Sequence, residues 1–172
     1  MDRYCLDANT LTNPFYETYP RNLEIFQNMW DLLAANQKSL VLIKPIYDEV
    51  LQFCEREAKD SDSNSLVNWL EEHNFSYIPI TSEDERLALN IRQEYKPGPK
   101  GISVTDSKLI AYVENQRPDL LDSFCLVTEE SPQTDKSKLK KKNYKIPAVC
   151  EERGIRCINL IDLLRELSSG TE

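Results

Sequence analysis

The sequence predicts an α/β protein, a three-layer α/β/α sandwich with a mainly parallel central sheet. Short apolar runs of strand length alternate along the chain with amphipathic patterns of helical period. The run Leu40–Ile43 is apolar at every position, which is typical of a strand buried on both faces of a parallel sheet. A length of 172 residues suits one domain. We therefore expect residues 1–172 to form a single domain, with a lysine-rich loop at about 131–145.

The opening stretch Tyr4–Leu6 is expected to form the central strand of this sheet, because so short a run of Tyr, Cys and Leu suits burial on both sides. The stretch Phe75–Ile80 alternates in polarity. Pro79 within it has no N–H to donate to a strand ladder, so an edge strand is predicted there. Further strands are predicted at 40–43, 124–127 and 155–158.

Helices are predicted between these strands from the spacing of apolar residues and from capping patterns. Ser82 and Glu85 match a capping box at the start of one helix. The predicted core face of the first long helix consists of Ile25, Met29, Leu32 and Leu33, widened by Phe26 and Trp30. The predicted helical segments are a short turn at 9–15 and helices at about 22–35, 45–54, 66–73, 82–95, 103–113, 146–154 and 160–167.

The cysteine and histidine content excludes several kinds of chemistry. The five cysteines are odd in number and form no Cys-x-x-Cys pair, which argues against a disulfide framework and a zinc site. His73 is the single histidine, so neither a histidine-rich metal site nor a Ser-His-Asp triad is expected. If the protein is an enzyme, its chemistry must depend on carboxylates. The cysteines, expected to be reduced core residues, are Cys5, Cys54, Cys125, Cys150 and Cys157.

The overall charge and hydropathy limit the partners. No apolar run approaches the length of a membrane span, and no signal-peptide pattern precedes the first strand, so a soluble cytoplasmic protein is expected. The formal net charge of −8 would repel nucleic acid from a broad binding face. Divalent cations held by acidic side chains would reverse the sign of the charge locally, so a nuclease remains compatible with this composition.

Acidic residues lie where the predicted fold would gather them. Asp7 follows the first strand, at the edge where ligands collect in open α/β sheets. Glu49 lies on or beside the buried face of its helix, and Asp106 lies on the inward side of a first helical turn. Glu129 and Glu130 follow a late strand, which repeats the arrangement around Asp7.

Each of these acids also has a structural interpretation. Asp7 could cap the helical turn that follows it, and this explanation is favoured when its stretch is considered alone. Glu49 could pack its stem against the protein while its carboxylate reaches solvent. Asp106 could complement the dipole of its helix.

Four short motifs follow one another along the chain: Leu6-Asp7-Ala8-Asn9, Asp48-Glu49-Val50, Thr105-Asp106-Ser107-Lys108-Leu109-Ile110-Ala111 and Val127-Thr128-Glu129-Glu130. In this order they resemble the PIN-domain (PilT N-terminus) family, and the resemblance covers nearly the whole chain. The closing stretch 145–159 resembles an uncharacterised prokaryotic PIN-like branch related to VapC-type toxins. Two positions depart from the family pattern. Ala8 stands where Thr or Ser is common, and the fourth acid is a Glu, with Glu129 as a rival to Glu130.

The resemblance implies a Mg²⁺- or Mn²⁺-dependent endoribonuclease that hydrolyses RNA phosphodiester bonds, similar to the toxin of a type II toxin–antitoxin pair. Carboxylate oxygens are the ligands that such hard cations prefer. The catalytic and metal-binding residues implied are Asp7, Glu49, Asp106 and Glu130. The supporting residues implied are Asn9, Thr128 and Glu129. The expected partners are an RNA substrate, an antitoxin protein and a second copy of the chain in a homodimer. No association with a membrane is expected. The alternative is a catalytically silent PIN-like scaffold that binds a protein partner.

The segment 131–145 is rich in lysine in a chain that is otherwise acidic. Such a run is more often a mobile, solvated loop than a binding element. The functional interpretation is a basic arm that follows the phosphates of RNA. Its predicted RNA-binding residues are Lys138, Lys140, Lys141 and Lys142.

Overall fold

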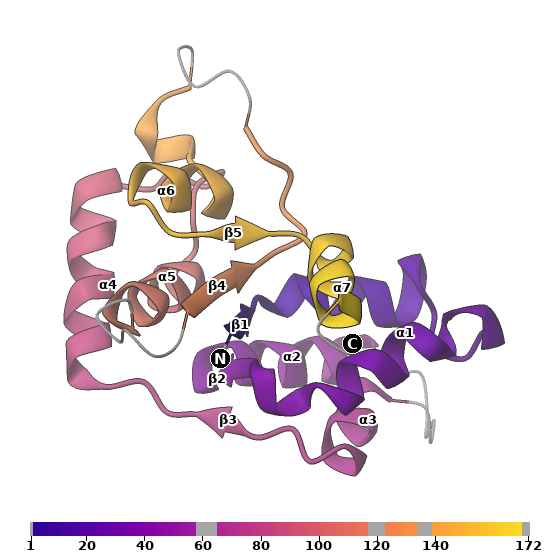
Figure 1. Cartoon of the computed structure of the whole chain (residues 1–172). Helices are drawn as coiled ribbons and strands as arrows, with labels where there is room; N and C mark the ends of the chain where they lie inside the picture. Colours follow the sequence, from indigo (N-terminus) through magenta and orange to yellow (C-terminus); the bar gives the residue numbers. More distant parts are fainter. Residues whose placement is uncertain (1, 58–64, 117–122, 134–138, 170–172) are drawn as a thin grey trace.

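The computed structural model describes residues 2–57, 65–116, 123–133 and 139–169. It contains a five-stranded sheet in the order β3-β2-β1-β4-β5, with every pair of neighbouring strands parallel (Figure 1). Helices flank the sheet, so the predicted three-layer α/β/α sandwich is confirmed. The strands are β1 Asp2–Leu6, β2 Leu40–Ile43, β3 Tyr77–Ile78, β4 Ser123–Val127 and β5 Cys157–Ile158.

Strand β1 lies at the centre of the sheet, as its composition predicts. Cys5 pairs with Val41 of β2 on one side and with Leu126 of β4 on the other. All three side chains are buried. Strand β3 lies at one edge and is shorter than predicted. It ends one residue before Pro79, whose missing N–H cannot extend the ladder.

Helices pack against each other on both sides of the strands. Helices α4 and α5 lie together at one side of the molecule, and α1 and α7 lie together at the other (Figure 1). The α-helices are α1 Glu24–Ala35, α2 Lys44–Glu57, α3 Leu66–Glu72, α4 Ser82–Tyr95, α5 Val104–Gln116, α6 Ile146–Glu152 and α7 Leu160–Ser169. The other helical turns are η1 Ala8–Thr10, η2 Pro14–Thr18, η3 Gln37–Ser39 and η5 Lys141–Asn143.

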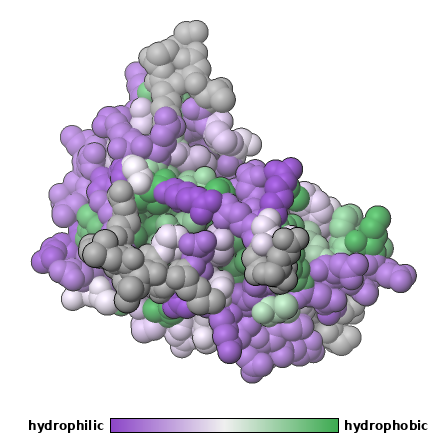
Figure 2. All heavy atoms as spheres, viewed as in Figure 1, coloured by the Kyte–Doolittle hydropathy of each residue, from purple (hydrophilic) through white to green (hydrophobic). Residues whose placement is uncertain are grey.

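The predicted core face of α1 is wrong at Ile25, which is 80% exposed. Two sets of apolar residues in α1 share the same helical spacing, so periodicity alone does not decide which set turns inward. The buried set contains Trp30, whose ring packs edge-on against Phe15 at 5.0 Å and Trp69 at 5.3 Å between ring centroids. Leu23, just before the helix, is also exposed. Figure 2 shows hydrophobic residues on the surface at the right of the molecule, the side on which Figure 1 labels α1.

The capping box of α4 lies one residue before the predicted position. Thr81, not Ser82, is the N-cap, and its side chain accepts a hydrogen bond from the amide of Asp84 at 3.2 Å. The Asp84 carboxylate accepts one from the Thr81 amide at 2.7 Å. Asp84 has the shorter side chain, and it is also buried against Asn115, so tertiary contact selects it over Glu85.

The remaining expectations about the body of the protein concern its cysteines and its surface. All five cysteines are free, and all except Cys157 are buried, as expected of reduced core residues. None of the helices that the structure describes is long and apolar enough to cross a membrane.

Candidate active site

Asp7 lies at the carboxyl end of β1, directly beside the end of β4. The register pairs Leu6 with Val127, and the Asp7 amide continues the ladder by donating to the Val127 carbonyl at 2.9 Å. The side chain of Asp7 is 4% exposed. Its Oδ2 accepts a hydrogen bond from the Thr128 hydroxyl at 2.8 Å. Two neighbouring parallel strands therefore deliver an acid and a hydroxyl to the same point.

Asp7 occupies the N-cap position of η1, but its side chain makes no capping hydrogen bond. The Thr10 amide and hydroxyl bond instead to the Asp7 backbone carbonyl, at 3.1 and 2.6 Å. The interpretation of Asp7 as a helix cap is therefore wrong. Its carboxylate is directed at Thr128, which leaves no local structural role that requires an acid.

Asn9 connects the loops that follow β1 and β4. Its Nδ2 donates to the Thr128 hydroxyl at 3.2 Å, and its Oδ1 accepts from the Glu129 amide at 2.9 Å. The Glu130 amide donates to the same hydroxyl at 3.2 Å. With two groups donating to its oxygen, the Thr128 hydroxyl directs its own hydrogen toward Asp7. The structure thus brings Asn9 and Thr128 together with Asp7.

Asp106 lies in the first turn of α5 and forms a capping box with Ser103. Its Oδ2 accepts from the Ser103 amide at 2.6 Å, and its own amide donates to the Ser103 hydroxyl at 3.0 Å. The helix-terminal role that the sequence allows is therefore present. Asp106 also acts on the site, because its charge is the largest single charge that raises the pKa of Asp7.

Glu49 lies in α2 and is exposed, so it does not lie on the buried face of that helix. Its carboxylate nevertheless faces the start of α5. Partial burial and the nearby Asp106 charge raise the pKa of Glu49, and a hydrogen bond from the Thr105 side chain lowers it. Glu49 therefore approaches the other acids from the solvent side.

Asp106, Glu130 and Glu49 lie near enough to Asp7 for their charges to act on its carboxyl group, and we call these four acids the acid cluster. The pKa of Asp7 is raised from 3.8 to about 7, mainly by burial and then by the charges of Asp106, Glu130 and Glu49, in that order. The hydrogen bond from Thr128 acts in the opposite direction. The pKa of Asp106 is also raised, first by burial and then by Glu130.

Glu129 and Glu130 have different positions, although they are adjacent in sequence. Glu129 accepts from the amide of Leu160, the first residue of α7, at 2.7 Å. Glu130 accepts from the amide of Ile146, the first residue of α6, at 2.8 Å and from Lys145 Nζ at 3.3 Å. Of the two charges, that of Glu130 acts on both Asp7 and Asp106.

A groove of about 430 Å³ opens beside these acids. Asn13 and Lys145 line it, and the sequence motifs identify neither residue as part of a site. Asn13 precedes a proline and is typical of a turn, and Lys145 ends the lysine-rich segment, so only the fold relates them to the acids. The full lining is Asn9, Asn13, Pro14, Thr18, Glu129, Glu130, Ser131 and Lys145.

The acids lie near one another, but their carboxylates are not arranged around a single cation position in the part of the chain that the structure describes. Among the residues that the structure describes, no group of three or more His, Cys, Asp or Glu side chains is placed to hold a metal ion. The cause is visible in the hydrogen bonds, since Asp106 faces the Ser103 amide and Glu130 faces the Ile146 amide. The donor set consists of carboxylates and hydroxyls, which suits Mg²⁺ or Mn²⁺ and not a soft metal.

The predicted RNA-binding lysines are not equivalent. Lys140 and Lys142 are exposed. Lys141 pairs with Glu152 at 2.8 Å and lies 5.4 Å from the centroid of the Tyr95 ring, so its charge is already engaged. Lys138 lies outside the described residues.

Comparisons with known proteins identify the family of the chain and one solved structure with a similar fold. A family model described as "Domain of unknown function (DUF4411)" matches residues 4–170. The fold is similar to that of a solved structure titled "Crystal structure of PAE2754 from Pyrobaculum aerophilum", with a TM-score of 0.58 and 15% sequence identity over 98% of this chain and 99% of that one. No curated protein matches the sequence.

Proposed function

The chain belongs to the DUF4411 family, and from the geometry of its site we propose that it is a Mg²⁺- or Mn²⁺-dependent endoribonuclease. The observation that carries the proposal is a buried Asp7 at the carboxyl edge of a parallel sheet, with its pKa raised by that burial and by the charges of three acids from other segments. In open α/β folds this edge is where ligands bind. The proposed cation-binding acids are Asp7, Glu49, Asp106 and Glu130.

The energetics of Asp7 support the binding of a cation beside these acids. Raising the pKa of Asp7 from 3.8 to about 7 means that its ionised form costs on the order of 4 kcal/mol in the folded chain. A chain that needed only packing here would be more stable with an apolar residue. A divalent cation would offset both the burial and the repulsion among the acids. Clusters of this kind occur where binding or catalysis requires them.

The chain's own residues have distinct roles in this proposal. Thr128 holds one oxygen of Asp7, and Asn9 holds Thr128. Asp106 and Glu49 approach from α5 and α2. The groove lined by Asn13 and Lys145 would accept the phosphate and its neighbouring sugar. When bound, the cation would stabilise the negative charge of the phosphate and lower the pKa of a water molecule that attacks the phosphorus. No histidine would then be needed as a general base.

The choice of RNA rests on the resemblance of the four motifs to PIN domains. The same resemblance supports the toxin of a type II toxin–antitoxin pair as its biological role, with an antitoxin protein and a second copy of the chain as partners. Rotation of Asp106 and Glu130 away from their helix amides would be required for all four acids to reach one cation.

A catalytically silent scaffold is the second candidate function, and a specific observation favours it. Asp106, Glu129 and Glu130 all bond to amides at the starts of helices, so three acids have a structural use without any metal. Such a protein would bind a partner through the same fold and bind divalent cations only weakly. The affinity for Mg²⁺ or Mn²⁺ distinguishes the two candidates, because the nuclease must bind the cation and the scaffold would bind it only weakly.

The test compares two capping acids in equivalent positions. Asp106→Asn should abolish Mn²⁺-dependent cleavage of a fluorescent single-stranded RNA and weaken Mn²⁺ binding measured by calorimetry. Asp84→Asn alters the corresponding capping box of α4, which is remote from the site, and should lower stability while the folded fraction keeps its cleavage rate. Equal activity in wild type and Asp106→Asn, or no Mn²⁺ binding by the wild type, would contradict the nuclease proposal.

A further inference from the structure

The lysines of this chain are concentrated in two segments. Eight of the twelve lysines lie within residues 96–100 and 136–145, and neither segment contains an acidic residue. The chain as a whole has a formal net charge of −8. Helix α5 and strand β4 separate the two segments along the chain, so the sequence does not show whether their charges act together.

The fold places the described parts of these segments side by side. The Gly98 amide donates to the Lys142 carbonyl at 2.9 Å, and the Ile102 amide donates to the Tyr144 carbonyl at 3.1 Å. The end of α4 and the start of α6 meet at this corner of the molecule (Figure 1). Beneath the two loops, the buried rings of Tyr95 and Tyr144 lie 6.0 Å apart. The loops therefore form one surface with a fixed base.

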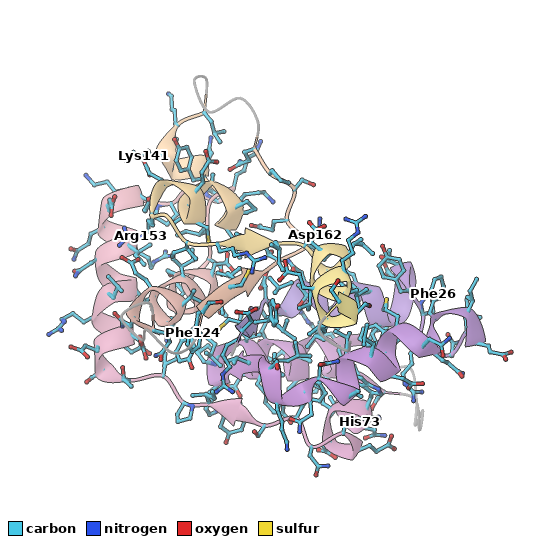
Figure 3. All side chains as sticks on the ribbon, in the orientation of Figure 1. Phe26, His73, Phe124, Lys141, Arg153 and Asp162 are labelled. Atoms are coloured by element: carbon cyan, nitrogen blue, oxygen red, sulfur yellow. The ribbon has the colours of Figure 1, made fainter. Side chains whose placement is uncertain are left out.

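Four lysines on this surface are exposed, and we call them the lysine ridge: Lys96, Lys100, Lys140 and Lys142. Within the described parts of the chain, none of them forms an ion pair. Their neighbours differ, since Lys141 pairs with Glu152 and Lys145 pairs with Glu130. In Figure 3, Lys141 lies at the top of this corner, and Arg153 lies between α6 and α4, where it pairs with Glu94. The ammonium groups of the ridge lysines are therefore available to pair with a negatively charged ligand.

The ridge leads to the acid site through Lys145. This residue follows Lys142 by three positions and lines the groove beside Asn9 and Glu130. Its charge lowers the pKa of Asp106, which shows that it acts on the acid cluster itself. An extended anion that occupies the groove can therefore continue onto the ridge.

We infer that the lysine ridge holds the phosphate backbone of single-stranded RNA as the strand leaves the acid site. The inference rests on the proposed nuclease function. It adds the path that the RNA strand follows across the surface beyond the acid site. Ammonium groups act as point charges toward phosphate without reading the bases, so the ridge would bind without sequence preference. The groove has the size of a small-molecule pocket, which admits a nucleotide of a single strand and not a duplex.

Gly101 sets how closely the two loops approach. A Cβ at position 101 would lie 2.4 Å from the Lys142 carbonyl oxygen and 2.9 Å from Pro97 Cβ, so a larger residue must push the loops apart. A Cβ at position 98 would lie 3.7 Å from the same oxygen, which is an ordinary contact. Alanine at the two glycines therefore gives a matched pair of variants: Gly101→Ala should widen the spacing of the loops, Gly98→Ala should not, and neither changes the charge of the ridge.

The first experiment measures binding without cleavage. A fluorescent single-stranded RNA is titrated in EDTA at several salt concentrations. Lys96→Gln/Lys100→Gln and Lys140→Gln/Lys142→Gln should each weaken binding, and each should make the slope of log K against log[salt] less steep by about 1.4. Arg86→Gln/Arg165→Gln removes the same charge from exposed positions on α4 and α7 and should leave the slope unchanged.

The second experiment tests the geometry of the ridge. Gly101→Ala should weaken RNA binding although no charge is lost, while Gly98→Ala should bind like the wild type. Thermal unfolding of each variant shows whether it is folded. If Gly101→Ala does not fold, the lysine pairs alone decide the question.

Two results would overturn the inference. One is an unchanged affinity and salt slope in Lys96→Gln/Lys100→Gln. The other is binding of poly-L-glutamate as tight as that of RNA, which would assign the ridge to acidic proteins. The proposed function can fail separately, because weaker RNA binding by the ridge variants would stand even if the wild type cleaved nothing with Mn²⁺. Conversely, cleavage by the wild type with no effect of the ridge variants would reject the ridge alone.

Discussion

Asp7 is the residue on which the candidate site depends, because its burial and its acidic neighbours act in the same direction. Its hydrogen bonds are one from Thr128 to the carboxylate, those of Thr10 to its backbone carbonyl, and the one that its own amide donates to the Val127 carbonyl. None of these bonds requires a charge at position 7. The acidity of Asp7 is therefore explained by function better than by structure.

The raised pKa of Asp7 predicts how stability depends on pH without metal. Between about pH 4 and pH 7 the unfolded chain releases the Asp7 proton while the folded chain keeps it, so the free energy of unfolding should fall as pH rises. The contribution of Asp7 is on the order of 4 kcal/mol. Asp7→Asn should remove this part and be the more stable protein at pH 7.5, as measured by urea unfolding in EDTA. Parallel pH profiles of wild type and Asp7→Asn would contradict the shift.

Thr128 provides a second prediction at the residue scale. Thr128→Val removes the hydroxyl that bonds to Asp7 and leaves the Asn9 amide without its acceptor. The free energy of unfolding should fall by about 1–3 kcal/mol, and RNA cleavage should fall as Asp7 loses its orientation. Thr128→Ser keeps the hydroxyl and should retain most of both properties. The readouts are urea unfolding and the single-turnover cleavage rate, and a fully active Thr128→Val would remove Thr128 from the site.

At the scale of elements, the ends of β1 and β4 and the starts of α2, α5 and α6 converge. Parallel strands bring their carboxyl ends to one edge, and the helices that follow begin there. Helix starts favour acids, since their amides are free and the helix dipole is positive. The same physics explains why the acids gather and why three of them bond to helix amides.

The two adjacent glutamates give the prediction at this scale. Glu129→Gln keeps an acceptor for the Leu160 amide but loses a charge at the start of α7, which should cost about 0.3–1 kcal/mol of stability with no change in Mn²⁺ affinity. Glu130→Gln should weaken Mn²⁺ binding, because the Glu130 charge reaches Asp7 and Asp106. Calorimetric titration of both variants distinguishes them. A larger loss of Mn²⁺ affinity in Glu129→Gln would reverse the assignment.

For the molecule as a whole, the acidic chain separates two tasks. Under the proposed function, the acid cluster would repel phosphate until a cation is bound, and the lysine ridge would attract phosphate without a cation. The excess of acidic residues elsewhere limits nonspecific adhesion of nucleic acid.

A metal that binds the folded chain alone should stabilise it as a whole. Mn²⁺ at about one hundred times its dissociation constant should add about 2.7 kcal/mol to the free energy of unfolding. The melting temperature of the wild type should therefore rise with Mn²⁺ at pH 7.5, and that of Asp7→Asn should not. The measurement is differential scanning fluorimetry with Ca²⁺ and Na⁺ as ionic controls. A similar rise in both proteins would place the binding elsewhere.

From the sequence alone one can determine the sandwich, the central position of β1 and the edge position of β3. Continuous apolar runs, alternating elements and Pro79 act locally, so periodicity and backbone chemistry reveal them. The arrival of Asp7 and Thr128 at one edge also follows from the sequence, because parallel strands must end together.

Only the tertiary structure decided which of several equivalent patterns is used. Apolar residues recur at the same helical spacing on two faces of α1. The face with Trp30 is buried because its ring packs against Phe15 and Trp69. Glu129 and Glu130 follow the same strand, and the positions of α7 and α6 separated their roles. The lysine ridge exists because Gly101 lets one loop approach the other. Local sequence sets the direction of a side chain relative to its own element, and contacts between distant segments decide what that side chain meets.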